Sequence, residues 1–467
     1  MSTGCRDLLP DARTARCPTR VSVALLLLGS WLWAPAGIGQ ELVAGRANQS
    51  PRFVRQGSRL YRTASFTDQE EGLADEALAV EILGEEIEET VATPHAAGRP
   101  RAAVSHGPNW SPRGWWARPE FLLWWLDGYD APPLVTTSPL GTSRDIAGEL
   151  EQTSTDVLFG GEALDAEVRP GGRFRLGYWF DRCAEYGLEA SYLRLAKKSS
   201  MFSADSSLDP VLARPFFNIE PGAEGQDVEL VAFPGLLDGH IRVDTQTQLQ
   251  GVEILSRQLL CQDCTRRVDW LAGYRYLQLD DELVISDFKR FVATGTGLQV
   301  GTTIEEFDRF ATQNDFHGGE LGLVAELRRR RWTLEVLGKV AIGTNRSRAT
   351  VNGSTTVIVP DPDEATTPYG LLALPGNSGT HAHDALAVIP EIGITLSYQF
   401  TPQLRGMLGY TFLYWSQVAR PGDQIDLDLN LSQIKPDGLT GPARPEFIWT
   451  DTAVWAQGLS LGLDCRF

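Results

Sequence analysis

Four histidines in the C-terminal half of the chain have neighbours that could support chemistry. His240 and His317 each lie two residues after an aspartate, and His383 directly precedes Asp384. A His–Asp pair can activate water as a general base, and the spacing of His381 and His383 could place two imidazoles on one metal ion. No nucleophile elbow or metalloprotease helix motif accompanies them. We therefore expect loop histidines without a catalytic role and predict that the protein is not an enzyme.

Clusters of carboxylates suggest a second kind of chemistry, the binding of calcium. One cluster spans residues 361–364, and a second contains Asp423, Asp426 and Asp428. A hard cation needs six to eight oxygen ligands converging on one point, so solvated acidic loops are the favoured interpretation. No glycine-rich loop follows a strand and opens a helix, as a phosphate site would require. We predict neither a metal nor a cofactor.

A third set of charged side chains falls on the small, polar face of segments whose other face is apolar. This set is Arg175, Glu189, Asp269, Arg275, Glu335, Lys339, Glu391 and Arg405. Because both signs are present, these groups could line a selective constriction or lock an interior plug through ion pairs. The sequence leaves both interpretations open.

The segments that carry these charges alternate with a period of two, which is typical of β-strands. They span residues 115–126, 173–180, 186–192, 243–257, 269–276, 314–328, 332–342, 388–400, 404–414 and 453–467. In the last segment Leu459, Leu461, Leu463 and Phe467 face one side, and small or polar residues face the other. In outer-membrane barrels such an apolar face meets lipid and the polar face meets the lumen. Phe467 gives the chain the aromatic end of a closing strand.

The connections between these segments alternate between long and short. The long ones are residues 127–170, 197–242, 280–313, 344–386 and 417–452, and each short one has at most nine residues. Outer-membrane barrels combine short periplasmic turns with longer extracellular loops. We predict an all-β fold: a transmembrane antiparallel up-and-down barrel of about ten strands, with twelve to fourteen if a long loop hides a hairpin.

Composition agrees with a barrel and excludes other classes. The net charge of −18 argues against nucleic-acid binding, which needs a positive footprint. The chain has 46 glycines, 13 tryptophans and 11 tyrosines, which suits a small-residue lumen face and aromatic belts at the membrane interfaces. No segment after the first 36 residues reaches the roughly 18 apolar residues of a spanning helix.

The N-terminal part has a different character. Residues 1–36 read as a signal peptide, with arginines before a short apolar run and a small-residue site at Ala34-Pro35-Ala36. Residues 37–112 are acidic and proline-rich, and we predict a mostly disordered periplasmic segment with room for one short helix. The barrel should occupy residues 113–467.

Four cysteines fall at predicted periplasmic turns or strand ends: Cys183, Cys261, Cys264 and Cys465. An oxidising compartment favours disulfides, and four cysteines allow three pairings. The Cys261-x-x-Cys264 spacing also occurs in redox and zinc sites, but no second pair accompanies it. Structural disulfides are the favoured interpretation.

Several longer motifs make the sequence recognisable. They include Gly171-Gly172-Arg173-Phe174-Arg175-Leu176-Gly177-Tyr178-Trp179, Asp269-Trp270-Leu271-Ala272-Gly273-Tyr274-Arg275-Tyr276-Leu277 and Arg420-Pro421-Gly422-Asp423-Gln424-Ile425-Asp426. Together they resemble an outer-membrane porin family found mainly in planctomycetes, called beta-barrel porin family seven. The resemblance covers about residues 115–467 and implies a barrel firmly and transport loosely. It implies no catalytic or binding residues.

These observations predict an outer-membrane protein that contacts lipid and is assembled by the barrel-assembly machinery through the strand ending at Phe467. The first functional hypothesis is passage of small hydrophilic solutes. The alternative is a structural or adhesive barrel with a blocked lumen and interacting loops, because barrels of about eight strands are filled by side chains whereas 16–18 strands leave a channel. A surface hydrolase is a third hypothesis. The sequence predicts no particular solute and no oligomeric state.

Overall fold

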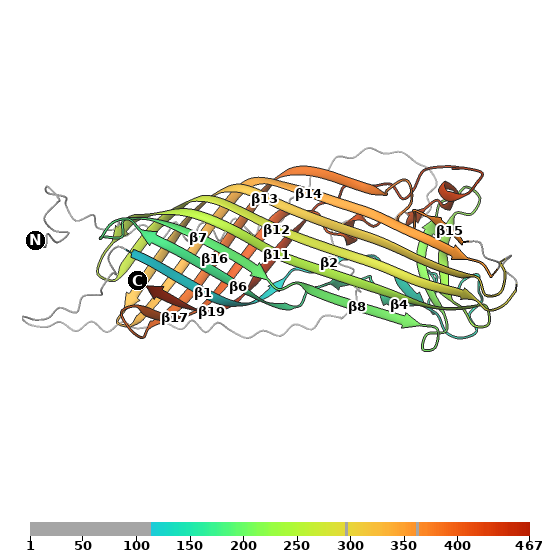
Figure 1. Ribbon diagram of the computed structural model, residues 1–467, viewed down its shortest axis with the longest axis horizontal. Coiled ribbons are helices and arrows are strands. Elements are labelled where there is room, and N and C mark those ends of the chain that lie inside the picture. Colours follow the sequence, from blue (N-terminus) through green and yellow to red (C-terminus); the bar gives the residue numbers. More distant parts are fainter. Residues whose placement is uncertain (1–113, 295–297, 361–363) are drawn as a thin grey trace, which may run out of the picture. The chain divides into compact units, whose positions relative to one another are not determined.

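The computed structural model describes residues 114–294, 298–360 and 364–467 (Figure 1). The predicted signal peptide and the segment 37–112 lie outside these residues. Within the described residues, no helix is long and apolar enough to cross a membrane.

Ten strands of the described chain close into one antiparallel ring. They are β1 (Gly114–Leu126), β6 (Val168–Trp179), β7 (Tyr186–Leu195), β11 (Leu237–Gln262), β12 (Arg266–Phe291), β13 (Thr303–Arg329), β14 (Trp332–Ile358), β16 (Gly379–Gln399), β17 (Leu404–Val418) and β19 (Thr452–Arg466). The ring closes where β19 pairs with β1, with Trp116 opposite Arg466. The predicted fold class and the count of ten are confirmed, and each predicted strand segment falls on one of these strands.

The register of the pairs determines the width of the barrel. We start at Leu334 on β14 and pass from each residue to its partner on the next strand until the ring is complete. This path returns to β14 at Arg346, so the stagger of the ring is twelve residues. Ten strands with this stagger, at ordinary strand spacing, require a tilt of about 40° and a backbone radius of about 10 Å. Long side chains from opposite walls can meet across such an interior.

Side chains alternate between the two faces of the wall as the sequence predicts. On β1, Trp124 is 1% exposed and points inward, whereas the adjacent Trp125 is 37% exposed and points outward. On β19, Leu459, Leu461 and Leu463 are exposed while the residues between them face the interior. The outward face is therefore the apolar one, which suits a barrel surrounded by lipid.

Four neighbouring strands, β11 to β14, are much longer than the sequence analysis predicts. They contain 26 or 27 residues each, whereas a tilted strand needs only about 9–11 residues to span a bilayer. Most of the predicted loops 280–313 and 344–386 is strand, so that prediction is wrong. The inward–outward alternation simply continues, for example through the inward-facing Ile285, Asp287 and Lys289 of β12. Figure 1 shows these strands running well beyond β1, β6, β17 and β19.

The remaining connections fold into a compact unit at the long-loop end, which we call the loop unit. Its main sheet has the order β10-β9-β3-β4, with β18 paired to β9. The elements in these connections are β2 (Tyr129–Asp130), β3 (Val135–Thr137), β4 (Asp156–Phe159), β5 (Ala163–Leu164), β8 (Lys198–Asp205), β9 (Leu212–Asn218), β10 (Gly225–Ala232), β15 (Glu364–Thr367), η1 (Gly422–Gln424), β18 (Asp428–Leu429) and η2 (Leu431–Ile434). β8 pairs with β11 beyond the end of β7, and β15 pairs with the end of β14, so these two strands extend the barrel wall. Neither adds a member to the ring, which keeps ten strands.

The loop unit shares an apolar core with the long strands. Val135 of β3, Leu212 and Phe216 of β9 pack in one buried cluster with Leu283 of β12 and Phe310 of β13. Burial of side chains from both partners is the main force that holds loops to a wall. The predicted loops are therefore ordered structure and fill the space between the long strands.

The cysteines lie where the sequence places them, but they do not all form disulfides. Cys183 and Cys261 are disulfide-bonded, while Cys264 is free and exposed and Cys465 is free and half-buried. The expectation that all four take part in disulfides is therefore wrong.

We expect a maleimide probe to label two cysteines in residues 114–467 of the non-reduced, folded barrel. Cys264 should react fast because it is exposed, and Cys465 more slowly because it is half-buried. Peptide mapping of the labelled protein measures this outcome. Labelling of Cys183 or Cys261 before reduction would contradict it.

The two adjacent tryptophans of β1 provide a matched test of the barrel's orientation. Trp124→Ala should lower the free energy of unfolding by about 3–5 kcal/mol, because it leaves a cavity in a packed interior. Trp125→Ala should cost clearly less, because its outward-facing side chain packs against no protein core. Urea unfolding of the refolded barrel in detergent measures both, and equal losses would contradict the assignment of the faces.

Candidate functional site: the barrel interior

All eight charged residues predicted on the polar strand faces point into the interior. Arg175, Arg275, Lys339 and Glu391 lie at one level together with Glu120, Arg173, Glu253 and Glu320, and we call these eight residues the central cluster. The other four predicted residues, Glu189, Asp269, Glu335 and Arg405, lie closer to the short turns. Whether any of them contacts a permeating solute stays a prediction.

The central cluster joins walls that are not neighbours in the ring. Arg275 of β12 bonds to Glu253 and Glu391, and its guanidinium lies 3.3 Å from Glu320. Glu391 belongs to β16, which β13 and β14 separate from β12. The Nζ atom of Lys339 lies 2.8 Å from Glu253 and 3.3 Å from Glu391. Two cations therefore bind the same carboxylates and tie strands together across the interior.

A second set of ion pairs, the short-turn cluster, lies nearer the short turns. Its members are Arg118, Glu189, Arg257, Arg267, Asp269, Glu326, Arg328, Glu335, Arg405, Asp464 and Arg466. Arg118 of β1 reaches Glu335 of β14 at 3.0 Å, again across the barrel. Arg257 lies 2.7 Å from Asp269 and 3.2 Å from Glu326. This end of the interior is also crossed by charged side chains.

The two clusters are close to electrically balanced and leave little space. The central cluster has four basic and four acidic side chains, which leaves no surplus charge to select ions of one sign. Three voids between these side chains measure about 10–20 Å³ each. A void of that size holds about one water molecule. Of the two interpretations left open by the sequence, this packing agrees with the ion-paired plug.

An apolar layer lies next to the central cluster on the side of the long loops. It includes Trp124 of β1, Leu277 of β12, Phe316 of β13 and Trp415 of β17, all nearly inaccessible. The rings of Phe316 and Trp415 meet edge to face with centroids 6.3 Å apart. A buried apolar layer is a poor path for hydrophilic solutes, because they would lose their hydration without gaining partners.

A further ionic contact fastens the loop unit to the long strands. Arg214 of β9 lies 2.9 Å from Asp287 of β12 and also bonds to Asp308 of β13. Burial by itself lowers the pKa of Arg214, but the neighbouring carboxylates Asp308 and Asp287 outweigh burial and raise this pKa above its ordinary value. The guanidinium therefore stays charged, and the loop unit is held by an ion pair as well as by its apolar core.

Two carboxylate triads in the described chain have oxygens close enough to hold a metal ion. One is Glu253, Glu320 and Glu391, and the other is Glu229, Asp287 and Glu306. In each triad a buried lysine already contacts all three carboxylates: Lys339 in the first and Lys289 in the second. The ammonium group supplies the positive charge that such a set of carboxylates needs.

His240 and His317 lie in separate environments, whereas His381 and His383 of β16 pack beside two aromatic rings that contact each other. His240 stacks on Phe288, and His317 is bonded to the hydroxyl of Tyr274 on the outer face of β13. His381 stacks on Phe447 with ring centroids 3.7 Å apart.

His383 and the acidic loop residues have partners of other kinds. The ring of His383 lies beside that of Trp449. Asp426 and Asp428 both face Arg444, at 3.2 Å each. Residues 361–363 lie outside the described residues. Ring packing and an arginine partner therefore hold these side chains in place.

Sequence reasoning missed several members of the clusters. Arg118 and Glu120 sit in a segment whose many tryptophans suggest a purely apolar strand, yet they alternate with the outward-facing residues as the rule requires. Glu253, Arg257, Glu320 and Glu326 lie in the two segments with the weakest alternation. These residues could have been found from the alternation, because each occupies a position whose neighbours two residues away also face the interior. The strand pairing makes this position clear.

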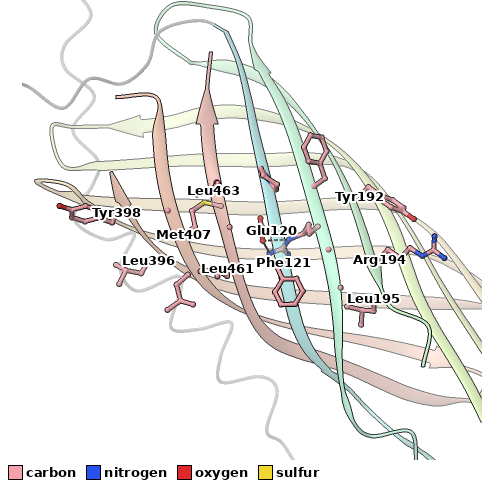
Figure 2. Close-up of a pocket in the computed structure, with 18 of the residues that line it drawn as sticks. Glu120, Phe121, Tyr192, Arg194, Leu195, Leu396, Tyr398, Met407, Leu461 and Leu463 are labelled. Atoms are coloured by element: carbon pink, nitrogen blue, oxygen red, sulfur yellow. Dashed lines mark hydrogen bonds and ion pairs between the residues drawn. The ribbon is translucent and has the colours of Figure 1, made fainter. Parts of the chain in front are cut away.

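A large hollow lies on the outer wall of the barrel and not in the lumen. It measures about 1260 Å³ and its lining is mainly apolar. Figure 2 shows Phe121, Tyr192, Leu396, Leu461 and Leu463 on this wall. All five are exposed, which identifies the hollow as part of the lipid-facing surface.

Comparison with known structures finds other outer-membrane barrels at low similarity. The outer membrane protease OmpT of Escherichia coli is 11% identical with a TM-score of 0.32, and the match covers 76% of this chain and 98% of that one. The CymD monoaromatic hydrocarbon channel is 8% identical with a TM-score of 0.17, and the match covers 76% of this chain and 89% of that one. At these scores the likeness carries no argument about function. No curated protein matches the chain.

A family model described as "Putative beta barrel porin-7 (BBP7)" matches residues 116–467. The match spans every strand of the ring and all of the loop unit. Its bounds agree with the resemblance seen in the sequence motifs. The chain therefore belongs to the beta barrel porin-7 family.

Proposed function

We propose that this protein is an outer-membrane barrel that is closed to solutes in the state described here and that holds a folded loop unit above the membrane. One observation carries the proposal: the interior is occupied by two ion-paired clusters and an apolar layer, with three voids of about 10–20 Å³ each among the charged side chains. The narrow ring of ten strands explains why side chains can fill it.

The surface that can act under this proposal is the extracellular part. Strands β11 to β14 are more than twice the length that spans a bilayer, so they project beyond it and surround the loop unit. The ion pairs of Arg214 and the shared apolar core keep this unit rigid. A rigid, ordered unit suits a structural or adhesive role, because little entropy is lost when a partner binds.

Passage of small hydrophilic solutes is the second candidate, and the family description favours it. In this protein, passage would require displacement of the loop unit and separation of the cross-barrel ion pairs. The charged interior would then offer groups such as Arg275 and Lys339 to a hydrated solute.

We also propose that the protein is not an enzyme, that residues 1–36 direct its export, and that the barrel-assembly machinery inserts it through β19. The separate packing partners of His240, His317, His381 and His383 support the first of these proposals. Hydrolysis by the purified barrel that disappears in a His383→Ala variant would overturn it.

Single-channel recording of the refolded full chain in a planar bilayer tests the closed barrel. We expect a folded barrel without stable open steps over a wide range of voltage and salt. Stable steps whose conductance shifts when Arg275 or Lys339 is neutralised would overturn the closed state and establish the interior as a path for solutes.

A further inference from the structure

The outer wall carries a basic residue without an acidic partner in the described chain. Arg194 of β7 is exposed, and the residues paired with it on the two adjacent strands are Gly172 of β6 and Gln250 of β11. The next outward residue on β7 is Tyr192, whose hydroxyl donates to Gln250. In Figure 2, Arg194 and Tyr192 both project away from the wall.

Three other outward-facing arginines have acidic partners. The guanidinium of Arg242 lies 2.6 Å from Asp244, and that of Arg309 lies 2.5 Å from Glu282. Arg346 lies 4.0 Å from Asp384. Arg194 has no such partner among the described residues, and Lys197, which is exposed three residues further along, adds a second positive charge at the same end of β7.

The position of Arg194 along its strand corresponds to a membrane interface. Tyr186 begins β7 at the short-turn end, and Arg194 follows it by eight residues. With a rise of about 3.3 Å per residue and a tilt of about 40°, the two lie roughly 20 Å apart along the barrel axis. The apolar band of such barrels is about 25 Å tall, so Arg194 lies at its extracellular boundary, where lipid phosphates are found.

The wall beside Arg194 has a notch that fits an acyl chain. Gly172 lies on the outward face between Phe121 of β1 and Arg194. A Cβ atom built there would meet only the carbonyl oxygen of Glu120, at 3.8 Å. Phe121 and Phe174 are both about half exposed and form apolar sides to this notch. The wall thus offers an apolar surface directly next to a pair of cations.

We propose that Arg194 and Lys197 bind the phosphate of an outer-leaflet lipid whose acyl chain lies over Gly172. Charge complementarity selects this occupant: Arg194 and Lys197 are two neighbouring exposed cations without acidic partners among the described residues, and the anion available at a membrane interface is a lipid phosphate. The proposal is independent of whether the lumen is open.

Native mass spectrometry of the refolded full chain in neutral detergent, titrated with phosphatidylglycerol, tests the proposal. Arg194→Gln combined with Lys197→Gln should weaken binding at least fivefold, because each cation near an anionic headgroup contributes a few-fold in affinity. Gly172→Leu should also weaken binding, since a Cβ atom at this position has no close contact and the larger side chain fills the notch. Arg309→Gln, which removes a paired arginine elsewhere on the outer face, should leave binding unchanged.

Two comparison ligands separate the phosphate from the acyl chain. A diacylglycerol with the same chains should bind the unaltered barrel weakly, and inorganic phosphate at high concentration should compete only partly with phosphatidylglycerol. Equal binding of phosphatidylglycerol to the double variant and the unaltered protein would overturn the proposal, as would equal binding of diacylglycerol. A heat-dependent shift in electrophoretic mobility verifies that every variant is folded.

Discussion

Replacing Arg275 by methionine should lower the free energy of unfolding of the barrel by roughly 3–5 kcal/mol, which is the usual cost of removing one partner from a buried ion pair. The side chain of Arg275 is 3% exposed and contacts Glu253, Glu320 and Glu391. Without it, Lys339 would be the one cation of the described chain in contact with all three carboxylates, whose oxygens lie within 4.8 Å of one another, and Arg173 would remain 3.8 Å from Glu391 alone. Methionine fills similar space, so the loss reports charge and not packing.

A double variant distinguishes this explanation from general damage. Adding Glu253→Gln to Arg275→Met removes one of the carboxylates left unpaired and should recover part of the loss, so the two effects should not add. Arg309→Met is the matched control, because that arginine is 37% exposed in its pair with Glu282 and exposed pairs contribute about 1 kcal/mol or less. Urea unfolding of the refolded barrels measures all variants. Losses that simply add would contradict a shared electrostatic cluster.

Replacing Arg214 by methionine should release the loop unit while the ring stays folded. Arg214 is nearly inaccessible and is the ionic contact of β9 with β12 and β13. Its removal leaves the buried carboxylates of Asp287 and Asp308 with less positive charge nearby. This should destabilise the contact between the loop unit and the wall by about 3–5 kcal/mol. We expect amide hydrogen exchange to become faster in β3, β9 and β10, and exchange in β1 and β19 to stay unchanged.

Lys435→Met is the control for this prediction, because Lys435 pairs with Glu220 at the surface of the same unit and is about half exposed. That variant should leave exchange in β9 unchanged. The Arg214→Met barrel should also stay electrically silent, because the apolar layer and the central cluster lie below the released unit. Uniform loss of protection across the ring would show that Arg214 supports the whole barrel and not the loop unit alone.

The sequence by itself determined the class of fold and the ten segments of the ring. Alternation is a local property of a strand: Leu459, Leu461 and Leu463 must share a face whatever their partners are. The alternation of long and short connections likewise follows from an antiparallel ring. For the same reason, the alternation alone predicts which charged side chains face the interior, among them Arg175, Arg275, Lys339 and Glu391.

Only the tertiary structure decided how far the strands extend and what fills the barrel. The sequence predicts a loop at residues 280–313 because beyond the membrane neither face of a strand needs to be apolar. The strand pairing continues there, but the apolar outward face that reveals a strand in the sequence is lost. The contact of Arg275 with Glu391 depends on the stagger of the ring, which no single strand encodes. Whether inward-facing charges line a channel or lock a plug is therefore set by register and radius, and a ring of ten strands brings opposite walls close enough for the charges to pair.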